Sequence, residues 1–111
     1  MNNHIRLYGQ IDGWPSKDEM ACLMKSAGFS VYVGRYSIRL QDCEHFVFQD
    51  YGGDFDVPQF DADASSLERM LADSARVSSA LASADIRHRF ELYDERDEMV
   101  GYLHHRWPQE S

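Results

Sequence analysis

Residues 86–107, IRHRFELYDERDEMVGYLHHRW, decide the fold of this chain. Apolar residues alternate with polar ones on both sides of an acidic turn at 95–98, which is the pattern of two strands that each bury one face. Only one register keeps apolar residues opposite one another and charged residues on the far side. That register predicts four cross-strand pairs: Leu92 with Gly101, Phe90 with Leu103, His88 with His105, and Ile86 with Trp107.

The far face of this hairpin is predicted to be basic and rich in aromatic side chains. Its residues are Arg87, Arg89, Glu91 and Tyr93 on one strand, with Val100, Tyr102, His104 and Arg106 on the other. An aromatic-rich face that no helix covers is a candidate surface for a partner. We therefore expect part of the sheet to remain open, with Tyr8, Tyr93, Tyr102 and Arg89 on the open side.

Two amphipathic helices are predicted in the rest of the chain. Ser16 stands three residues before Glu19, a spacing typical of the reciprocal capping pair at a helix N-terminus. Apolar residues at helical spacing then run over 16–27, and Gly28 follows where a left-handed residue ends a helix. A second apolar stripe predicts a helix over 65–84. The capping pair of this second helix is predicted to be Ser65 and Glu68, with Asp61 or Asp63 as alternative starts.

Three further strands complete the prediction, over 3–11, over 29–40 with a bend at Gly34, and over 45–51. The element order is then β-α-β-β-α-β-β in one α+β domain spanning 1–111. The first six elements have the order of a ferredoxin-like split βαβ, extended by a fifth strand. We expect a mostly antiparallel five-stranded sheet with both helices on one face, and frayed residues at 108–111.

Size and composition limit the class of protein. A chain of 111 residues with 43% hydrophobic and 13% aromatic residues fits one globular domain with its own core. Cys22 and Cys43 have no metal-binding or redox spacing, which predicts reduced thiols in the cytoplasm. The first ten residues show no secretory signal, and no run of about 18 apolar residues indicates a membrane span.

Negative charge is concentrated in residues 41–68, which hold eight acidic side chains and no Lys or Arg. The whole chain has 19 acidic and 11 basic residues and a net charge of −8, so acids and bases balance outside that stretch. This distribution argues against direct binding to nucleic acid, whose phosphates need Lys and Arg. It favours a basic protein partner or a cation, while solubility alone is the simplest explanation of the charge.

The loop expected at 50–63 mixes these carboxylates with aromatic side chains. Carboxylates speed the encounter with a basic surface, and aromatic residues supply tight contact. An inhibitor of a nuclease needs this combination, because its carboxylates would take the place of phosphates in the groove of the enzyme. The predicted partner-binding residues are Asp50, Tyr51, Asp54, Phe55, Asp56, Phe60, Asp61 and Asp63.

In size, acidity and lack of a catalytic motif, the chain resembles the small immunity proteins that protect bacteria from toxins. It has no phosphate-binding glycine loop and no nucleophile elbow. We therefore predict a non-enzymatic inhibitor of a basic toxin or nuclease, without a cofactor. A homodimer formed through the open sheet face is an alternative.

A second alternative is a small metal protein or enzyme built on His88 and His105. Cross-strand neighbours have Cβ atoms about 5 Å apart, so the two rings could share an ion. A zinc site needs further ligands, and Cys22 on the first helix is the candidate for a third one. The competing interpretation is two histidines hydrogen-bonded at the edge of the core. Calcium in the acidic loop fits less well, because the spacing is not that of an EF-hand.

Overall fold

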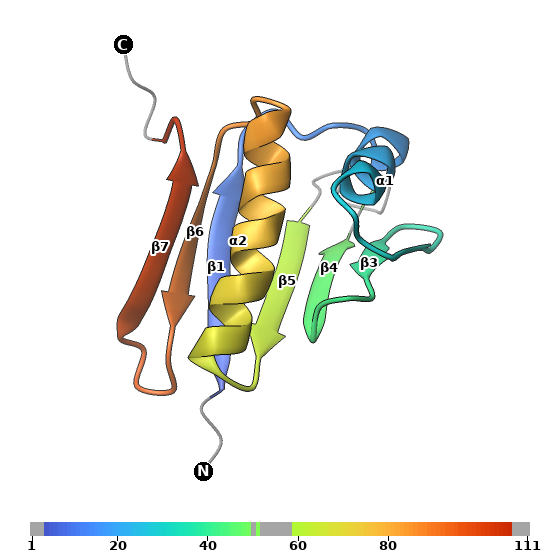
Figure 1. Cartoon of the computed structure of the whole chain (residues 1–111). Coiled ribbons are helices and arrows are strands. Elements are labelled where there is room, and N and C mark those ends of the chain that lie inside the picture. Colours follow the sequence, from blue (N-terminus) through green and yellow to red (C-terminus); the bar gives the residue numbers. More distant parts are fainter. Residues whose placement is uncertain (1–3, 50, 52–58, 108–111) are drawn as a thin grey trace.

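Two helices lie against one face of a seven-stranded antiparallel sheet in the computed structural model, which describes residues 4–49, 51 and 59–107 (Figure 1). The predicted α+β class and the position of the helices are confirmed, whereas the strand number is seven rather than five. The elements in chain order are β1 (Ile5–Ile11), α1 (Lys17–Ser26), β2 (Val31–Val33), β3 (Ile38–Leu40), β4 (His45–Gln49), β5 (Gln59–Ala64), α2 (Leu67–Ser83), β6 (His88–Tyr93) and β7 (Met99–His105).

The two additional strands come from segments for which the prediction was wrong. The strand expected over 29–40 is a hairpin of β2 and β3, closed where the Gly34 N–H donates to the Ser37 carbonyl at 2.8 Å. Residues 59–64, expected as the end of a loop and a helix start, form β5 between β4 and β1. The inward residues of β5 include two alanines, whose small side chains give only a weak alternating signal.

The strand order is β2-β3-β4-β5-β1-β6-β7, so the first long strand lies inside the sheet. The β5-α2-β6 connection passes over β1, which pairs antiparallel with both strands and separates them. This is the split βαβ arrangement that the predicted element order indicated. The hairpin of β2 and β3 extends one side of this arrangement, and β7 extends the other.

The core lies between the helices and the covered face of the sheet. One apolar row crosses four strands through the paired residues Phe46, Ala62, Leu7 and Leu92. α2 packs on the middle strands and on β7, while α1 contacts β2, β3 and α2. The largest fully buried side chains are Phe46, Phe48, Phe90, Met20, Met24, Ile38, Leu40, Met70, Leu81, Leu92, His88 and Val77.

The helix ends agree with one predicted capping pair and correct the other. The Ser16 hydroxyl accepts a hydrogen bond from the Glu19 N–H at 3.2 Å, as predicted. The second cap is Ser66, which accepts from the Arg69 N–H at 3.1 Å, whereas the predicted cap Ser65 donates its N–H to the Glu44 carboxylate. Neither described helix is long and apolar enough to cross a membrane. Residues 108–111, predicted to be frayed, lie outside the described residues.

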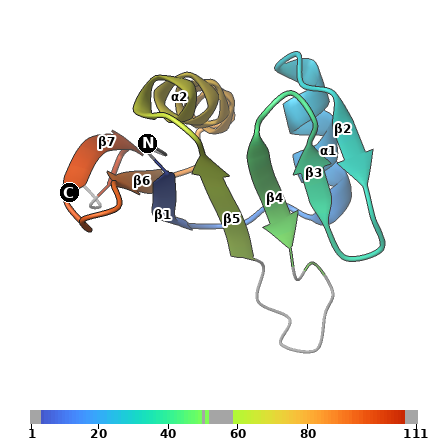
Figure 2. The same ribbon diagram turned by 90° about the horizontal axis from the view of Figure 1, so that it is seen from below.

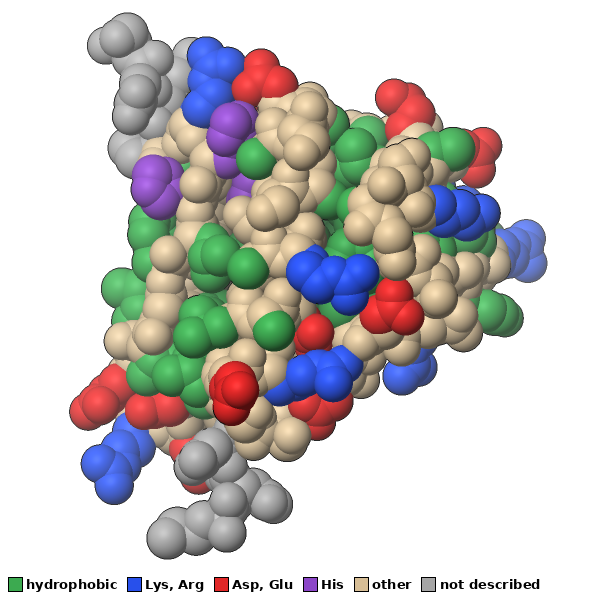
Figure 3. Space-filling view, in the orientation of Figure 1, with side chains coloured by type: hydrophobic (Ala, Val, Ile, Leu, Met, Phe, Trp, Pro, Cys, Tyr) green, Lys and Arg blue, Asp and Glu red, His purple; other side chains and the backbone are tan. Residues whose placement is uncertain are grey.

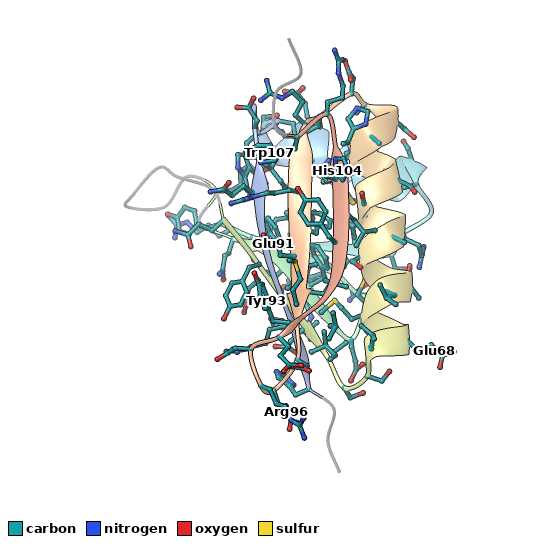
Figure 4. All side chains as sticks on the ribbon, turned by 90° about the vertical axis from the view of Figure 1, so that its left-hand side faces the viewer. Glu68, Glu91, Tyr93, Arg96, His104 and Trp107 are labelled. Atoms are coloured by element: carbon teal, nitrogen blue, oxygen red, sulfur yellow. The ribbon has the colours of Figure 1, made fainter. Side chains whose placement is uncertain are left out.

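Three of the four cross-strand pairs predicted in the C-terminal hairpin are confirmed, with Val100 as an extra bulged residue near the start of β7. The pair of Ile86 with Trp107 is wrong. β7 ends at His105, and Arg106 has a φ of 53° and is held by Asp85 at 3.0 Å. The chain turns there, and Trp107 lies on the opposite side of the sheet from α2 (Figure 4).

Candidate functional site

The sheet face opposite the helices is not covered by any described element, and we call it the open face (Figure 2). It is made by every second residue of the inner strands and of β7, because side chains alternate across a strand. The open face combines charged, amide and aromatic side chains. Its principal residues are Arg6, Tyr8, Gln10, His45, Val47, Gln49, Gln59, Asp61, Asp63, Arg89, Glu91, Tyr93, Tyr102 and His104.

Three carboxylates lie near the middle of the open face, and we call Asp61, Asp63 and Glu91 the open-face carboxylates. Glu91 is paired with Tyr8 across β1 and β6, and Asp63 is paired with Arg6 across β1 and β5. The Asp61 side chain is 60% exposed and Tyr8 is 50% exposed. Figure 4 shows Glu91 and Tyr93 directed away from α2. Negative charge and aromatic surface are therefore presented together.

The open-face carboxylates on β5 contact histidines, while Arg6, the cross-strand neighbour of Asp63, forms its ion pair with Asp97. Asp61 lies 3.1 Å from the Nε2 of His45, and Asp63 lies 4.0 Å from the Nε2 of His4. These contacts are solvent-exposed, and exposed pairs contribute little free energy. A cationic side chain from a partner could replace either histidine at small cost.

Two tyrosines give the open face its aromatic surface. The rings of Tyr8 and Tyr93 meet edge to face at a centroid distance of 5.4 Å. Burial of the phenol and the neighbouring charge of Glu91 raise the pKa of Tyr93 above its ordinary value. The hydroxyl of Tyr93 is protonated at neutral pH, as in any ordinary tyrosine, and its hydrogen bond to Glu91 also raises the pKa.

Other acids of the 41–68 stretch have structural roles. Asp42 accepts a hydrogen bond from the Ser30 N–H at 2.9 Å. Glu44 accepts from the Ser65 N–H at 3.1 Å, and the hydrogen bonds from Ser65 hold the pKa of Glu44 below its ordinary range. The acidic stretch is thus not one site, since these two carboxylates fasten loops while Asp61 and Asp63 face outward.

Tyr51 and Phe60, predicted as partner contacts, take part in packing. Tyr51 is 7% exposed and donates its hydroxyl hydrogen to the Pro15 carbonyl at 3.1 Å, so it is a core residue rather than a surface anchor. Phe60 is half-buried and stacks on Phe46 at 5.8 Å. The other predicted contacts Asp50, Asp54, Phe55 and Asp56 lie outside the described residues.

A cleft of about 480 Å³ lies where β1 and β5 separate. The two strands pair only from Ile5 to Leu7, and beyond that point the ring of Phe60 packs against Gly9. A Cβ at Gly9 would lie 2.7 Å from the Cζ of Phe60, so only glycine permits this approach. The residues lining the cleft include Gln10, Asp12, Trp14, Gln59, Phe60 and Trp107.

This cleft was not predicted, although the sequence holds one signal for it. Both tryptophans of the chain line the cleft, and tryptophan is a residue that often marks binding sites. Trp14 stands in a connection after β1, and Trp107 follows β7, far away in sequence. Only the tertiary structure brings the two rings to one place.

His88 and His105 lie opposite each other as predicted, with ring centroids 6.1 Å apart. His88 has no free nitrogen, because Nδ1 donates to the Ile86 carbonyl at 2.8 Å and Nε2 accepts from the Ser78 hydroxyl at 2.7 Å. Burial lowers the pKa of His88, which keeps the ring neutral. The geometry favours the interpretation of a hydrogen-bonded core histidine over a metal ligand.

No third metal-binding side chain joins this pair within the described part of the chain, where no group of three or more such side chains gathers. The cysteines are both free, with Cys22 exposed on α1 and Cys43 buried. Burial raises the pKa of the Cys43 thiol to about 12, so this thiol is not a nucleophile at neutral pH.

No family model, curated protein or solved structure matches this chain. A functional proposal therefore rests on the open face and the cleft.

Proposed function

We propose that this chain is a non-enzymatic domain that binds a basic protein through the open face. The most concrete form of the proposal is an immunity-type inhibitor of a basic toxin or nuclease. The observation that carries it is that the open-face carboxylates lie near Tyr8 and Tyr93 on a sheet face that no described helix or strand covers. The cysteines are unpaired, which fits a reducing cytoplasm.

The two kinds of side chain would serve different stages of binding. Carboxylates on a chain of net charge −8 attract a cationic partner over about one Debye length, roughly 8–10 Å at physiological salt. Tyrosine rings then supply contact area at a low cost in side-chain entropy. The association rate should therefore fall with salt, whereas the dissociation rate should depend on the aromatic contacts.

The acids in the connection between β4 and β5 support the inhibitor form of the proposal. By sequence, Asp50, Asp54 and Asp56 lie between these two strands, and β5 itself carries Asp61 and Asp63. A toxin groove that holds a row of phosphates would be complementary to such a series of carboxylates. The open-face carboxylates would be one part of that series.

Capture of the partner is the first test. The purified protein is immobilised, exposed to lysate of the source cell, and washed first at low and then at high salt. We expect one basic protein, retained at near-equal stoichiometry and released by salt.

Variants then locate the contact on the purified pair. We expect Asp61→Asn/Glu91→Gln to weaken binding by tenfold or more and to flatten its salt dependence, measured by calorimetry at several salt concentrations. Asp54→Asn/Asp56→Asn tests the connection separately. The matched control is Asp18→Asn/Glu68→Gln, which removes two charges from the helices, and Glu68 lies away from the open face (Figure 4). Equal affinity of the control and the Asp61→Asn/Glu91→Gln variant would contradict the proposal.

A further inference from the structure

Arg87 and Arg89 hold the only buried side-chain nitrogen or oxygen atoms without a hydrogen-bond partner among the described residues. These atoms are the two Nε groups, on alternate residues at the start of β6. A buried donor without an acceptor costs about 1–3 kcal/mol. Such an atom in a folded protein indicates a bound group or water that completes it. Of the two, Arg87 already has a carboxylate partner in Asp12, which leaves Arg89 as the candidate for such a group.

Arg89 also has no counter-ion among the described residues. Arg87 lies 3.1 Å from a carboxylate oxygen of Asp12, but no ion pair joins Arg89 to any acid in the described part of the chain. Its cross-strand neighbours are Gln10 on β1 and His104 on β7, neither of which carries negative charge. A half-buried guanidinium without a carboxylate is unexpected in a chain with 19 acids and 11 bases.

Trp107 connects these arginines to the cleft, because it contacts both guanidinium groups and lines the cleft, whereas neither arginine is itself a lining residue. The guanidinium carbons of Arg87 and Arg89 lie 5.9 and 5.6 Å from the centre of its ring. Trp107 is at the same time a wall of the 480 Å³ cleft, together with Trp14 and Phe60. This volume is within the range of small-molecule sites, and flat aromatic walls favour a planar ligand. Figure 3 shows the molecule from the side on which the helices lie, opposite the open face.

We propose that the cleft binds a small molecule in which an oxyanion is attached to a planar ring. The oxyanion would accept hydrogen bonds along the edge of Arg89 that contains Nε, since a guanidinium binds oxyanions best through two parallel N–H groups. The ring would lie against the aromatic walls. Carboxylates and phosphates share this chemistry, and the experiment below separates them. The Nε atom of Arg89 is buried and its guanidinium lies beside the Trp107 ring, so this ring would have to shift for the oxyanion to reach it.

This site is independent of the protein-binding proposal. The carboxylates proposed to meet a basic partner are Asp61, Asp63 and Glu91, whereas the cleft uses Arg89 and the two tryptophans. Different variants report on the two sites, so either proposal can fail alone.

Tryptophan fluorescence tests the proposal directly, because both tryptophans of the full chain line the cleft. Adenosine 5′-monophosphate and nicotinate serve as phosphate and carboxylate probes on planar rings. Inorganic phosphate and adenosine present each half alone. We expect a saturable change in tryptophan emission with at least one of the two ring-bearing probes. Half-saturation should need at least tenfold less of this probe than of inorganic phosphate or adenosine alone. No saturable change with both ring-bearing probes would overturn the proposal.

Two arginine variants assign the contact. Arg89→Gln should weaken binding of the effective probe by tenfold or more. Arg39→Gln, which removes an exposed arginine from β3, should leave the affinity unchanged. If Arg89→Gln does not fold, Arg89→Lys keeps the charge without the planar fork and should also weaken binding. Wild-type affinity in a folded Arg89 variant would overturn the assignment.

Discussion

The covered face and the open face of this sheet are built from the same strands, yet they have opposite characters. In β6, Phe90 is fully buried, whereas the next residue, Glu91, is directed away from the helices. In β1, Leu7 is 5% exposed and Tyr8 is 50% exposed. Because side chains alternate along a strand, one stretch of sequence supplies both the buried core of the domain and the surface proposed to bind a partner.

The two faces also differ in how much free energy each side chain contributes. Fully burying a large apolar side chain contributes about 1.5–3 kcal/mol. The exposed ion pairs of the open face, such as His45 with Asp61, contribute about 0–1 kcal/mol. Substitutions on the covered face should therefore unfold the protein, and those on the open face should change binding alone.

The largest expected effect is that of Phe90→Ala. Phe90 is fully buried and lies 5.4 Å from the ring of Phe60, so its removal leaves a cavity at the centre of the core. We expect the free energy of unfolding to fall by about 3–5 kcal/mol. Tyr8→Ala, on the neighbouring strand but on the open face, should cost less than about 1 kcal/mol. Equal losses in chemical denaturation would break the distinction between the faces.

Two glycines on the covered face sharpen the comparison. A Cβ at Gly9 would lie 2.5 Å from the Arg89 carbonyl oxygen, a backbone atom held in the sheet. A Cβ at Gly101 would lie 2.8 Å from the end of the Leu92 side chain, which can move. We expect Gly9→Ala to cost about 2–3 kcal/mol and Gly101→Ala less than about 1 kcal/mol. The midpoints of urea unfolding would show the reverse order if β1 were free to shift.

His88 should make the stability of the covered face depend on pH. Its pKa is lowered by burial, so the unfolded chain binds the proton more tightly than the folded one. The contribution is complete above the unfolded pKa of about 6.5 and is lost as the pH falls below it. Unfolding free energies at pH 8 and pH 5.5 should differ less in Ser78→Ala/His88→Leu than in the wild type. The same difference in both proteins would exclude His88 as a cause.

The smallest expected effect on stability is that of Glu91→Gln. This side chain is on the open face and forms no ion pair with a described residue, so the free energy of unfolding should change by less than about 0.5 kcal/mol. Thermal unfolding monitored by circular dichroism measures the change. A larger loss would mean that the open face also stabilises the fold. Weaker partner binding by this variant could then result from partial unfolding as well as from a lost contact.

Local patterns were sufficient for much of the fold. The alternation in the C-terminal hairpin predicted three cross-strand pairs correctly, because a shift of one residue would have exposed Phe90 and Leu92. The Ser16 cap was predicted for a similar reason, since its partner Glu19 is three residues away. The prediction failed at β5, whose alanines carry little hydrophobic signal, and at Ser65, whose N–H is taken by a residue distant in sequence.

The candidate site was predicted only in part. Asp61 and Asp63 were named from the density of acidic residues, and they do face outward. Tyr51 was predicted as a partner contact because it lies in the same stretch. It is buried instead, and its hydroxyl donates to the Pro15 carbonyl. Exposure depends on which distant segment packs against a residue, and charge density along the chain does not contain that information.

By itself, the sequence determined the secondary structure that depends on near neighbours: the Ser16 helix cap, the alternating faces and the register of a tight hairpin. The tertiary structure alone decided that β1 lies between β5 and β6, that β1 and β5 stop pairing after Leu7, and that Trp14 and Trp107 both line the cleft there. The physical reason is one of range. Turns and caps are settled by contacts within a few residues, whereas a cleft forms from packing among segments that the whole chain must first bring together.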